Sequence, residues 1–324
     1  MKFLILRFSS IGDIVLTTPV MRCLRKAMPD AEIHFCTKKA FAGILAPNPN
    51  IDKLHLLDAD MPDLIARLKA EQFDMVIDLH NNLRTRRIKW ALGVKACSYN
   101  KLNIQKWLYV NFRIDTLPKV HIVHRYLETL RKLNVPDDGL GLDFFIEKDS
   151  EINLSEIPES HRLGYSAVVI GAQHFTKRLP PERIAELCIS IPGPVILLGG
   201  PEDKLRGEEI LEILTSHAGK VFNACGKFSL QGSASLVKEA NLVFSHDTGL
   251  MHIAAAFGKT IYSIWGNTTP KFGMYPFRTP YVVWENNKLT CRPCSKIGYA
   301  ACPKGHFKCM KDINFTFNQE ILHE

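Results

Sequence analysis

Two short stretches of this 324-residue sequence combine residue types that could do chemistry, and the first is FSSIGD. An apolar run ends at Phe8, and the hydroxyls of Ser9 and Ser10 follow. Gly12 allows a tight turn in front of Asp13, which could simply cap the next helix. An acid would repel a bound pyrophosphate, and the G-x-G-x-x-G fingerprint is absent. We therefore predict that Asp13 meets a neutral hydroxyl and acts as a general base.

The second stretch is SHDTGLMHIAAAFG, in which a turn at Asp247 precedes a helical pattern that begins near Leu250. The N-terminal amides of such a helix attract anions. Thr248 adds a hydroxyl, and Gly249 lets a ligand approach the backbone. His252 lies one turn into the helix, where it could reach the same ligand or pack in the core. This pattern predicts a cradle for a diphosphate.

Two further loops place charged residues after predicted strands. In GAQHFTKRLP, either Lys177 or Arg178 could neutralise a departing diphosphate, or both could be ordinary surface charges. In LLGGPED, either Glu202 or Asp203 could bind the two hydroxyls of a ribose. Capping of the following helix explains that acid equally well.

Apolar runs such as KFLILRF, FDMVIDLH, YSAVVIGA and ANLVFSHD predict strands, and helical patterns alternate with them. This alternation indicates parallel α/β sheets, in which ligands gather at the carboxyl ends of the strands. A polar stretch at 147–162 predicts a linker. We expect two Rossmann-like domains, 1–155 and 156–312, with a cleft between them. Residues 313–324 are expected to form a helix that packs back.

Composition is typical of a soluble globular protein, with 46% hydrophobic and 23% charged residues. No apolar run is long enough to span a bilayer, and we predict a cytoplasmic location. The net charge of +8 is concentrated between Arg84 and Lys132, where twelve basic residues face two acidic ones. Nucleic acid, an anionic membrane surface or an anionic substrate would suit this segment, and a solubilising surface is the alternative.

Four of the nine cysteines form the pattern C-x2-C-x7-C-x6-C near the C-terminus, with His306 among them. Thiolates at this spacing can hold a structural zinc, and a set of thiols packed under a loop is the alternative. The four residues are Cys291, Cys294, Cys302 and Cys309.

The stretches FSSIGDIVLTTPVMRCLRKAMPDAEIHF and HDTGLMHIAAAFGKTIYSIWGNTTP resemble the glycosyltransferase family that contains the ADP-heptose:lipopolysaccharide heptosyltransferases. The segment DLHNNLRTRRIKWALG and the K-R-x-P of KRLP also fit, and the resemblance covers nearly the whole chain. It implies the GT-B fold, with two Rossmann-like domains facing an interdomain cleft. It also implies inverting transfer of a heptose from an ADP-sugar to a lipopolysaccharide inner-core acceptor, without a cofactor or a catalytic metal.

The resemblance also assigns roles to residues. Asp13 is the catalytic base, and Lys177 assists the leaving diphosphate. The first domain binds the anionic lipopolysaccharide acceptor, and the second binds the nucleotide sugar. Expected donor contacts are Gly12, Lys177, Glu202, Asp247, Thr248, Gly249, Leu250 and His252. Expected acceptor contacts are Ser10, Arg84, Arg87, His121 and Arg125.

Three alternatives stay open on the sequence. A glycosyltransferase of the same fold could use another donor or acceptor. A nicotinamide-dependent oxidoreductase would share the Rossmann halves, although its glycine fingerprint is missing. A zinc-bearing nucleic-acid binder could use the basic segment, although no standard module matches. The leading hypothesis predicts no nucleic-acid partner and allows peripheral contact with the inner membrane.

Overall fold

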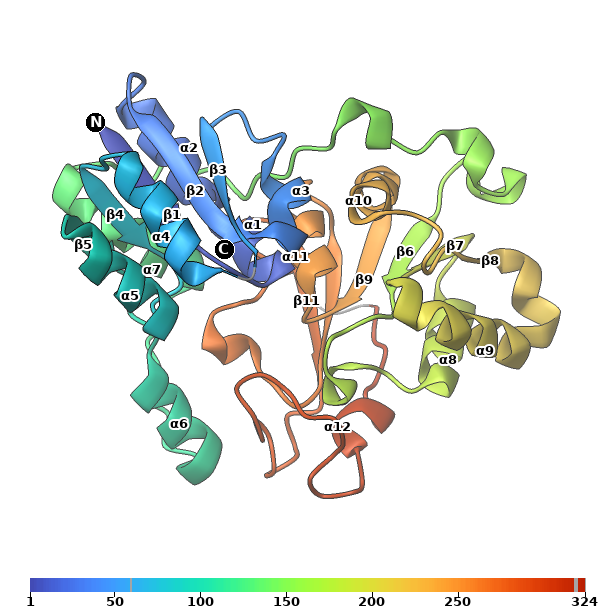
Figure 1. Ribbon diagram of the computed structural model, residues 1–324. Coiled ribbons are helices and arrows are strands. Elements are labelled where there is room, and N and C mark those ends of the chain that lie inside the picture. The colour runs from blue at the N-terminus through green and yellow to red at the C-terminus, as the bar shows by residue number, and fades with distance from the viewer. Residues whose placement is uncertain (59, 318–319, 324) are drawn as a thin grey trace. The chain divides into compact units, whose positions relative to one another are not determined.

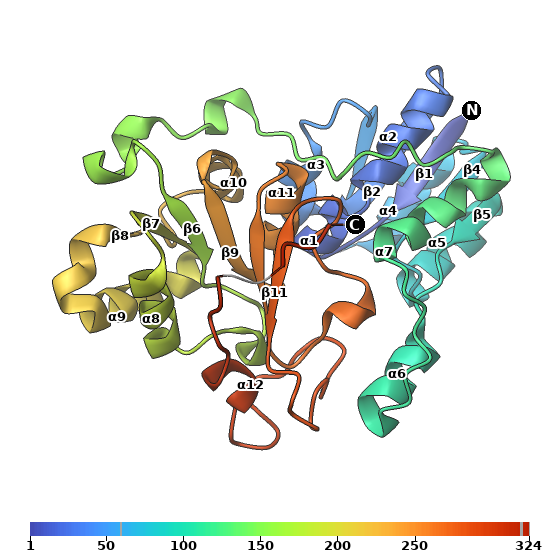
Figure 2. The same cartoon turned by 180° about the vertical axis from the view of Figure 1, so that it is seen from behind.

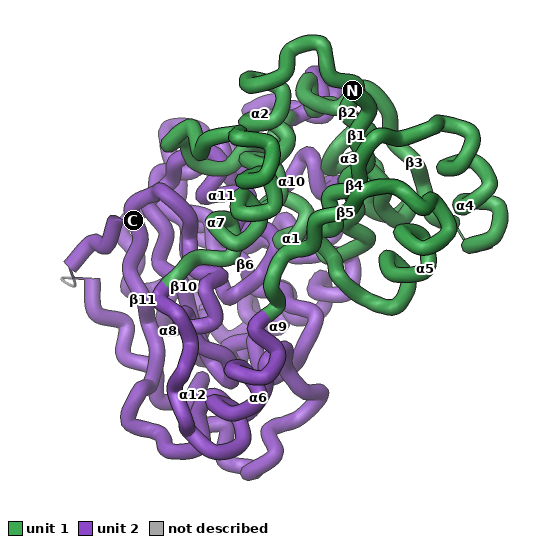
Figure 3. The backbone as a smooth tube through the Cα atoms, turned by 90° about the vertical axis from the view of Figure 1, so that its left-hand side faces the viewer, with its two compact units in different colours: residues 1–101, 120–145 green, residues 102–119, 146–324 purple. Residues whose placement is uncertain are grey.

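The computed structural model describes residues 1–58, 60–317 and 320–323. The chain divides into two compact units (Figure 3). Unit 1 comprises Met1–Lys101 and Val120–Phe145, and unit 2 comprises Leu102–Lys119 and Ile146–Glu324. Each unit holds one parallel sheet with helices between its strands, which confirms the predicted α/β class. Within the described ranges, we find no helix with the length and apolar character needed to cross a membrane.

Unit 1 is built on a five-stranded sheet with the order β3-β2-β1-β4-β5, and every neighbouring pair is parallel. The apolar run at the N-terminus forms the central strand, with Phe3 to Leu6 fully buried. The strands are β1 (Lys2–Leu6), β2 (Glu32–Lys38), β3 (Lys53–Leu57), β4 (Met75–Asp78) and β5 (Lys95–Ser98).

The helices of unit 1 cover both faces of this sheet (Figures 1 and 2). Local sequence explains their ends: Asn82 caps α5 by accepting the Thr85 N–H, and Gly93 ends it at a φ of 66°. The α-helices are α1 (Ile11–Val15), α2 (Thr18–Ala27), α3 (Ala42–Leu45), α4 (Met61–Ala70), α5 (Leu83–Leu92) and α7 (Ile122–Leu127). The 3-10 helices are η1 (Lys39–Phe41) and η2 (Glu128–Leu133).

Unit 2 is built on a six-stranded parallel sheet with the order β11-β10-β9-β6-β7-β8. Its core includes the stacked rings of Phe244 and Tyr262, whose centroids lie 4.8 Å apart. The strands are β6 (Ser166–Val169), β7 (Val195–Leu198), β8 (Val221–Asn223), β9 (Leu242–His246), β10 (Ile261–Trp265) and β11 (Tyr281–Glu285).

Two of the longer helices of unit 2 begin where proline or serine favours a helix start. Pro181 opens α8, and the Ser229 hydroxyl caps α10 by accepting the Gly232 N–H. The α-helices are α6 (Asn103–Phe112), α8 (Pro181–Ser190), α9 (Lys204–Leu214), α10 (Leu230–Glu239), α11 (Gly249–Ala256) and α12 (Lys308–Lys311). The 3-10 helices are η3 (Lys148–Ser150), η4 (Leu154–Glu156), η5 (Glu159–His161), η6 (Phe175–Lys177), η7 (Pro201–Asp203), η8 (Thr215–Lys220) and η9 (Pro270–Phe272).

Strand order fixes where ligands can gather in each unit. In unit 1 the chain runs outward from β1 in one direction and from β4 in the other, so the switch point lies between these two neighbours. In unit 2 the switch point lies between β6 and β9. Right-handed crossovers place the following helices on opposite faces at such a point, which leaves a crevice at the carboxyl ends of the two strands.

The unit boundaries differ from the expected domains 1–155 and 156–312. Unit 1 ends at Phe145 and unit 2 continues from Ile146, ten residues before the expected boundary. In addition, the segment 102–119 belongs to unit 2. Side-chain contacts explain the second difference, since Arg113 donates to the carbonyl of Thr290 at 3.0 Å and the Tyr109 ring packs edge-on against Phe272. The basic segment from the sequence analysis is therefore divided between the two units.

The C-terminal tail packs back on unit 2, but its described residues, 313–317 and 320–323, contain no helix. Phe317 lies over the rings of Tyr262 and Trp284, and the Trp284 indole donates to the carbonyl of Thr316. Leu322 then forms an antiparallel bridge with Tyr281. The described residues of 313–324 therefore do not form the expected helix, and residues 318, 319 and 324 of that prediction lie outside the described ranges.

Candidate active site

Asp13 lies in the first turn of α1, the helix that follows β1, at the switch point of unit 1. Its Oδ2 atom accepts the backbone N–H of Ser10 at 3.1 Å and the Ser10 hydroxyl at 2.9 Å. Its Oδ1 atom lies 2.7 Å from Nη2 of Arg7, the residue directly after β1. Asp13 thus closes a capping box, as its capping alternative predicted, and it also holds a buried cation.

Arg7 is anchored on several sides. Its Nη1 atom donates to the carbonyl of Leu79 at 2.5 Å and to the Tyr126 hydroxyl at 3.1 Å. Its Nε atom donates to the carbonyl of Ser9 at 2.8 Å. Burial is the largest single influence on the pKa of Arg7 and lowers it, but Asp13, Tyr126 and Tyr99 together raise it by more, so the net pKa lies above the ordinary value. The guanidinium is therefore a fixed positive charge beside the Asp13 carboxyl group.

His80, which was not predicted from the sequence, completes this cluster. It follows β4, the strand next to β1, and its ring packs edge-on against Phe8 with centroids 5.6 Å apart. Burial first, and then the charge of Arg7, lowers the pKa of His80 to about 4. The imidazole is therefore neutral at physiological pH. Its position at the polar carboxyl end of the predicted FDMVIDLH strand could have identified His80 as a site residue.

The residues expected to contact the acceptor differ in exposure: some are accessible to solvent and others are buried. Ser10 contacts Asp13, as described above, and its neighbour Gly12, which was predicted as a donor contact, is buried inside α1. Arg84 and Arg87 are exposed on α5. His121 is fully buried and its Nδ1 atom accepts the Val123 N–H, so the structure gives it the role of a helix cap for α7. A buried cap does not contact a ligand in solution.

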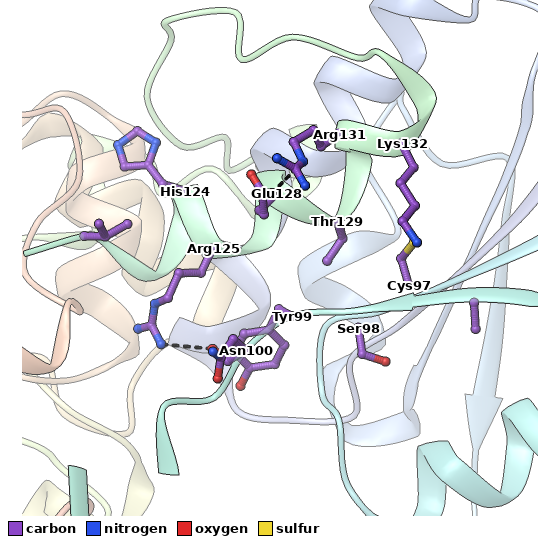
Figure 4. Close-up of a pocket in the computed structure, with 12 residues that line it drawn as sticks. Cys97, Ser98, Tyr99, Asn100, His124, Arg125, Glu128, Thr129, Arg131 and Lys132 are labelled. Atoms are coloured by element: carbon purple, nitrogen blue, oxygen red, sulfur yellow. Dashed lines mark hydrogen bonds and ion pairs between the residues drawn. The ribbon is translucent and has the colours of Figure 1, made fainter. Parts of the chain in front are cut away.

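Arg125 lines a cavity of about 530 Å³ in unit 1 (Figure 4). The cavity lies between the edge strand β5 and the α7–η2 segment, and Arg131 and Lys132 also line it. Arg125 points toward Asn100 and donates to its carbonyl at 3.2 Å. Burial lowers the pKa of Arg125, which nevertheless remains a cation in water. Glu128 also lines the cavity and pairs with Arg131 at 2.8 Å, so the three basic residues leave an excess of positive charge that suits an anionic ligand.

In unit 2, the loop after β6 brings Lys177 to the end of β9. The Lys177 ammonium lies 2.5 Å from Oδ2 of Asp247 and donates to the Asp247 carbonyl at 3.2 Å. Thr268, which follows β10 and was not selected from the sequence, donates to the same Oδ2 atom at 3.3 Å. Residues from three loops thus meet at the switch point of unit 2, as the strand order predicts.

Helix α11 begins beside this ion pair. Thr248 is its N-cap, with the Thr248 hydroxyl 3.3 Å from the Ser245 hydroxyl. Asp247, Thr248, Gly249 and Leu250 are all partly exposed, so the first turn of α11 is accessible. His252 is buried one turn further on. The accessible N–H groups and the Lys177 ammonium together suit a diphosphate.

His246 holds the Lys177 loop against β9, and it too was missed from the sequence. Its Nε2 atom accepts the backbone N–H of Leu179 at 3.0 Å, and it is almost fully buried. Burial lowers the pKa of His246 to about 3, so the ring stays neutral and accepts this bond at any physiological pH. The imidazole therefore positions the loop rather than carrying charge.

The two acids of the LLGGPED loop have separate roles. Asp203 is buried, and its Oδ2 atom accepts the Gly200 N–H at 3.1 Å, which is the capping alternative. Burial raises the pKa of Asp203. Glu202 is exposed at the end of β7. Of the two, Glu202 is the one that a ligand in solution can reach.

The C-terminal cysteines do not form a compact ligand set in this structure. Within the described residues, three or more ligand-type side chains come within 4.8 Å of one another only at His34, His55 and Glu71, and at Cys23, Asp137 and Asp138. The Sγ atom of Cys291 lies 3.8 Å from Nε2 of His306. A zinc ion held by Cys291, Cys294, Cys302 and Cys309 stays a prediction.

The model of glycosyltransferase family 9 (heptosyltransferase) matches residues 61–303, which is more than half of the chain. The chain belongs to glycosyltransferase family 9. Lipopolysaccharide heptosyltransferase 1 from Campylobacter coli is 25% identical to this family 9 chain over 312 residues, or 90% of this chain and 91% of the relative.

Two solved structures are similar to this family 9 protein. The family 9 glycosyltransferase from Veillonella parvula DSM 2008 has 26% identity and a TM-score of 0.72, with 87% of this chain and 86% of that chain covered. The Escherichia coli heptosyltransferase WaaC with ADP-2-deoxy-2-fluoro heptose has 20% identity and a TM-score of 0.65, with 87% and 92% covered. The comparisons confirm the GT-B fold and the lipopolysaccharide heptosyltransferase family.

Proposed function

We propose that this family 9 glycosyltransferase moves a heptose from ADP-heptose to an anionic acceptor of the lipopolysaccharide inner core, with inversion at the anomeric carbon. The ion pair between Lys177 and Asp247 carries the proposal, because it fixes an ammonium group beside the accessible first turn of α11. A fixed cation beside a helix N-terminus is the arrangement that a nucleoside diphosphate requires.

On the donor side, the nucleoside diphosphate leaves with increasing negative charge. We propose that Lys177 and the N–H groups of Gly249 and Leu250 stabilise this charge, while the exposed Glu202 binds the ribose. Asp247 would orient the Lys177 ammonium through its carboxylate and backbone carbonyl. Each fixed donor of this kind is worth about 3 kcal/mol of the barrier.

On the acceptor side, Asp13 takes the proton of the attacking hydroxyl. Its carboxylate is already oriented by Ser10 and Arg7, so it needs no reorganisation at the moment of reaction. The acceptor oxygen forms its bond to the anomeric carbon as the bond to the diphosphate breaks. One direct displacement inverts the configuration and requires no covalent sugar–enzyme intermediate.

The positive charge around the Arg125 cavity supports an anionic acceptor. Three basic residues, Arg125, Arg131 and Lys132, line it with one acid, Glu128, and Arg84 and Arg87 add exposed charge on α5 of the same unit. Carboxylates or phosphates of an inner-core acceptor would be attracted to such a surface.

The proposal is tested by nucleotide binding and then by transfer. Calorimetric titration with ADP, UDP, GDP and NAD should give one preferred nucleoside diphosphate, expected to be ADP. Incubation with ADP-heptose and truncated lipopolysaccharide should release ADP and yield a product whose anomeric configuration, read by NMR, is opposite to that of the donor. Preference for another nucleotide would contradict ADP-heptose as the donor. Transfer with retained configuration would contradict the proposed mechanism.

A further inference from the structure

Helix α6 has two contrasting faces, and one of them packs on the rest of unit 2. Lys106, Tyr109 and Arg113 share this face at helical spacing. The Lys106 ammonium lies 5.5 Å from the ring centre of Phe272, and Tyr109 packs edge-on against the same ring. Arg113 donates to the carbonyls of Thr290 and Pro293, both at 3.0 Å. This face is therefore occupied by the protein's own residues.

The opposite face of α6 presents large apolar side chains to solvent. Ile104, Trp107 and Phe112 are 72%, 50% and 58% exposed, and no residue of the helix is buried. The Trp107 and Phe112 rings contact each other with centroids 5.2 Å apart, and Ile114 beyond the helix is 50% exposed. Figure 1 shows α6 standing apart from the sheet of its unit. Single exposed apolar residues are common, but a cluster of this kind indicates an interaction surface.

The loop that α6 contacts is strongly basic. Between Asn286 and Lys311 it holds six basic residues and no acid. Five of the six are exposed: Lys288, Lys296, Lys304, Lys308 and Lys311. Ile297 and Tyr299 of the same loop are also exposed. The one acid of the segment 102–119 is Asp115, and it is neutralised by Lys271 at 2.7 Å. Positive charge and apolar side chains thus occur together here.

We propose that the outer face of α6 and the loop 286–311 form a docking surface for a membrane that carries anionic lipid. Tryptophan and phenylalanine suit the boundary between headgroups and acyl chains, and lysines are attracted to anionic headgroups while their stems lie on apolar surface. The positive charge of these lysines favours an anionic membrane over a neutral apolar partner. The inference goes beyond the proposed reaction, because it concerns attachment to a surface and is measured without donor or acceptor.

The test is binding of the full chain to vesicles. The protein should float with vesicles of phosphatidylcholine and phosphatidylglycerol, and binding should fall at least about tenfold in 0.5 M NaCl or with phosphatidylcholine alone. The triple variant Ile104→Ser/Trp107→Ser/Phe112→Ser should lower the partition coefficient at least about tenfold. A matched control is Leu163→Ser/Leu205→Ser, which removes two exposed leucines elsewhere in unit 2 and should bind as the wild type.

Fluorescence gives a readout that does not depend on the triple variant. Trp107 and Trp90 are the exposed tryptophans, so Trp90→Phe isolates Trp107 against the two buried ones. Its emission should shift to shorter wavelength on anionic vesicles and be quenched by brominated lipid. The proposal is overturned if Trp107 emission does not change, if the triple variant binds like the wild type, or if α6 instead mediates a concentration-dependent dimer that excludes vesicles.

Discussion

The Nη2 atom of Arg7, directly after β1, lies 2.7 Å from the Oδ1 atom of Asp13 in the first turn of α1. The Arg7 side chain is 9% exposed and that of Asp13 is 21% exposed, so the acid reaches solvent while the cation behind it does not. This relationship separates two roles. Asp13 is placed to contact a substrate, and Arg7 is placed to position Asp13.

Replacement of Asp13 by asparagine should abolish transfer and keep the fold. Asparagine keeps the side-chain shape and can accept the Ser10 N–H, but it cannot take a proton from the acceptor. We expect kcat to fall about 10²- to 10⁴-fold with nucleotide affinity unchanged. Initial rates of ADP release and calorimetric titration with ADP measure the two quantities. Wild-type transfer by this variant would show that Asp13 only caps the helix.

Replacement of Arg7 by methionine should destabilise unit 1, because it leaves a partly buried carboxylate and the Leu79 carbonyl without their cation. We expect a loss of about 3 kcal/mol in the free energy of unfolding. In the double variant with Asp13→Asn the loss should be smaller than the sum of the two single losses, by about 0.5–3 kcal/mol. Urea unfolding of the four proteins measures this coupling. Additive losses would contradict a direct ion pair.

Replacement of Lys177 by methionine should weaken ADP binding about 10- to 100-fold, since a charge-assisted hydrogen bond to phosphate is lost. Lys238→Met is a matched control, because it removes a lysine from another ion pair of unit 2, the one with Glu151 at 3.0 Å. Calorimetric titration of both variants with ADP tests this. Equal affinities in the two variants would remove Lys177 from the donor site.

Stability should decrease as the pH falls from about 6.5 toward 4. The pKa values of His55 and His80 are about 4 and that of His246 is about 3, each lowered mainly by burial. In this window the unfolded chain binds protons that the folded protein does not, so acid favours unfolding. Each fully shifted histidine contributes a slope of about 1.4 kcal/mol per pH unit.

His246→Gln tests the assignment of one of these slopes, because glutamine can still accept the Leu179 N–H but does not titrate. Urea unfolding should give a shallower pH dependence in the variant, by about 1.4 kcal/mol per pH unit near pH 5 and by little at pH 7. The same slope in the variant and the wild type would mean that His246 is protonated in the folded protein.

Much of the candidate site followed from the sequence because it depends on local patterns. Apolar runs ended by polar turns marked β1 and β9, and the residues that follow them, Asp13 and Thr248, occur at the predicted helix starts. The parallel alternation of strands and helices predicted that such residues lie at carboxyl ends. Both are properties of consecutive residues, which periodicity and turn chemistry determine.

Other features depend on contacts between residues that are far apart in the chain, and the sequence alone could not predict these contacts. His80 joins Arg7 and Asp13 because β4 pairs with β1, and Thr268 joins Lys177 because β9 lies between β6 and β10. His121 was selected for its place in a basic segment, but burial makes it a cap.

The sequence by itself determined the α/β class, the two parallel sheets and the turns that carry Asp13, Lys177 and Thr248. Only the tertiary structure decided that Arg7 holds Asp13, that α6 belongs to unit 2 and that the described residues of the C-terminal tail form no helix. The physical reason is that strand and helix formation follows from neighbouring residues, whereas ion pairs and packing follow from strand order and burial, which involve residues far apart in the chain.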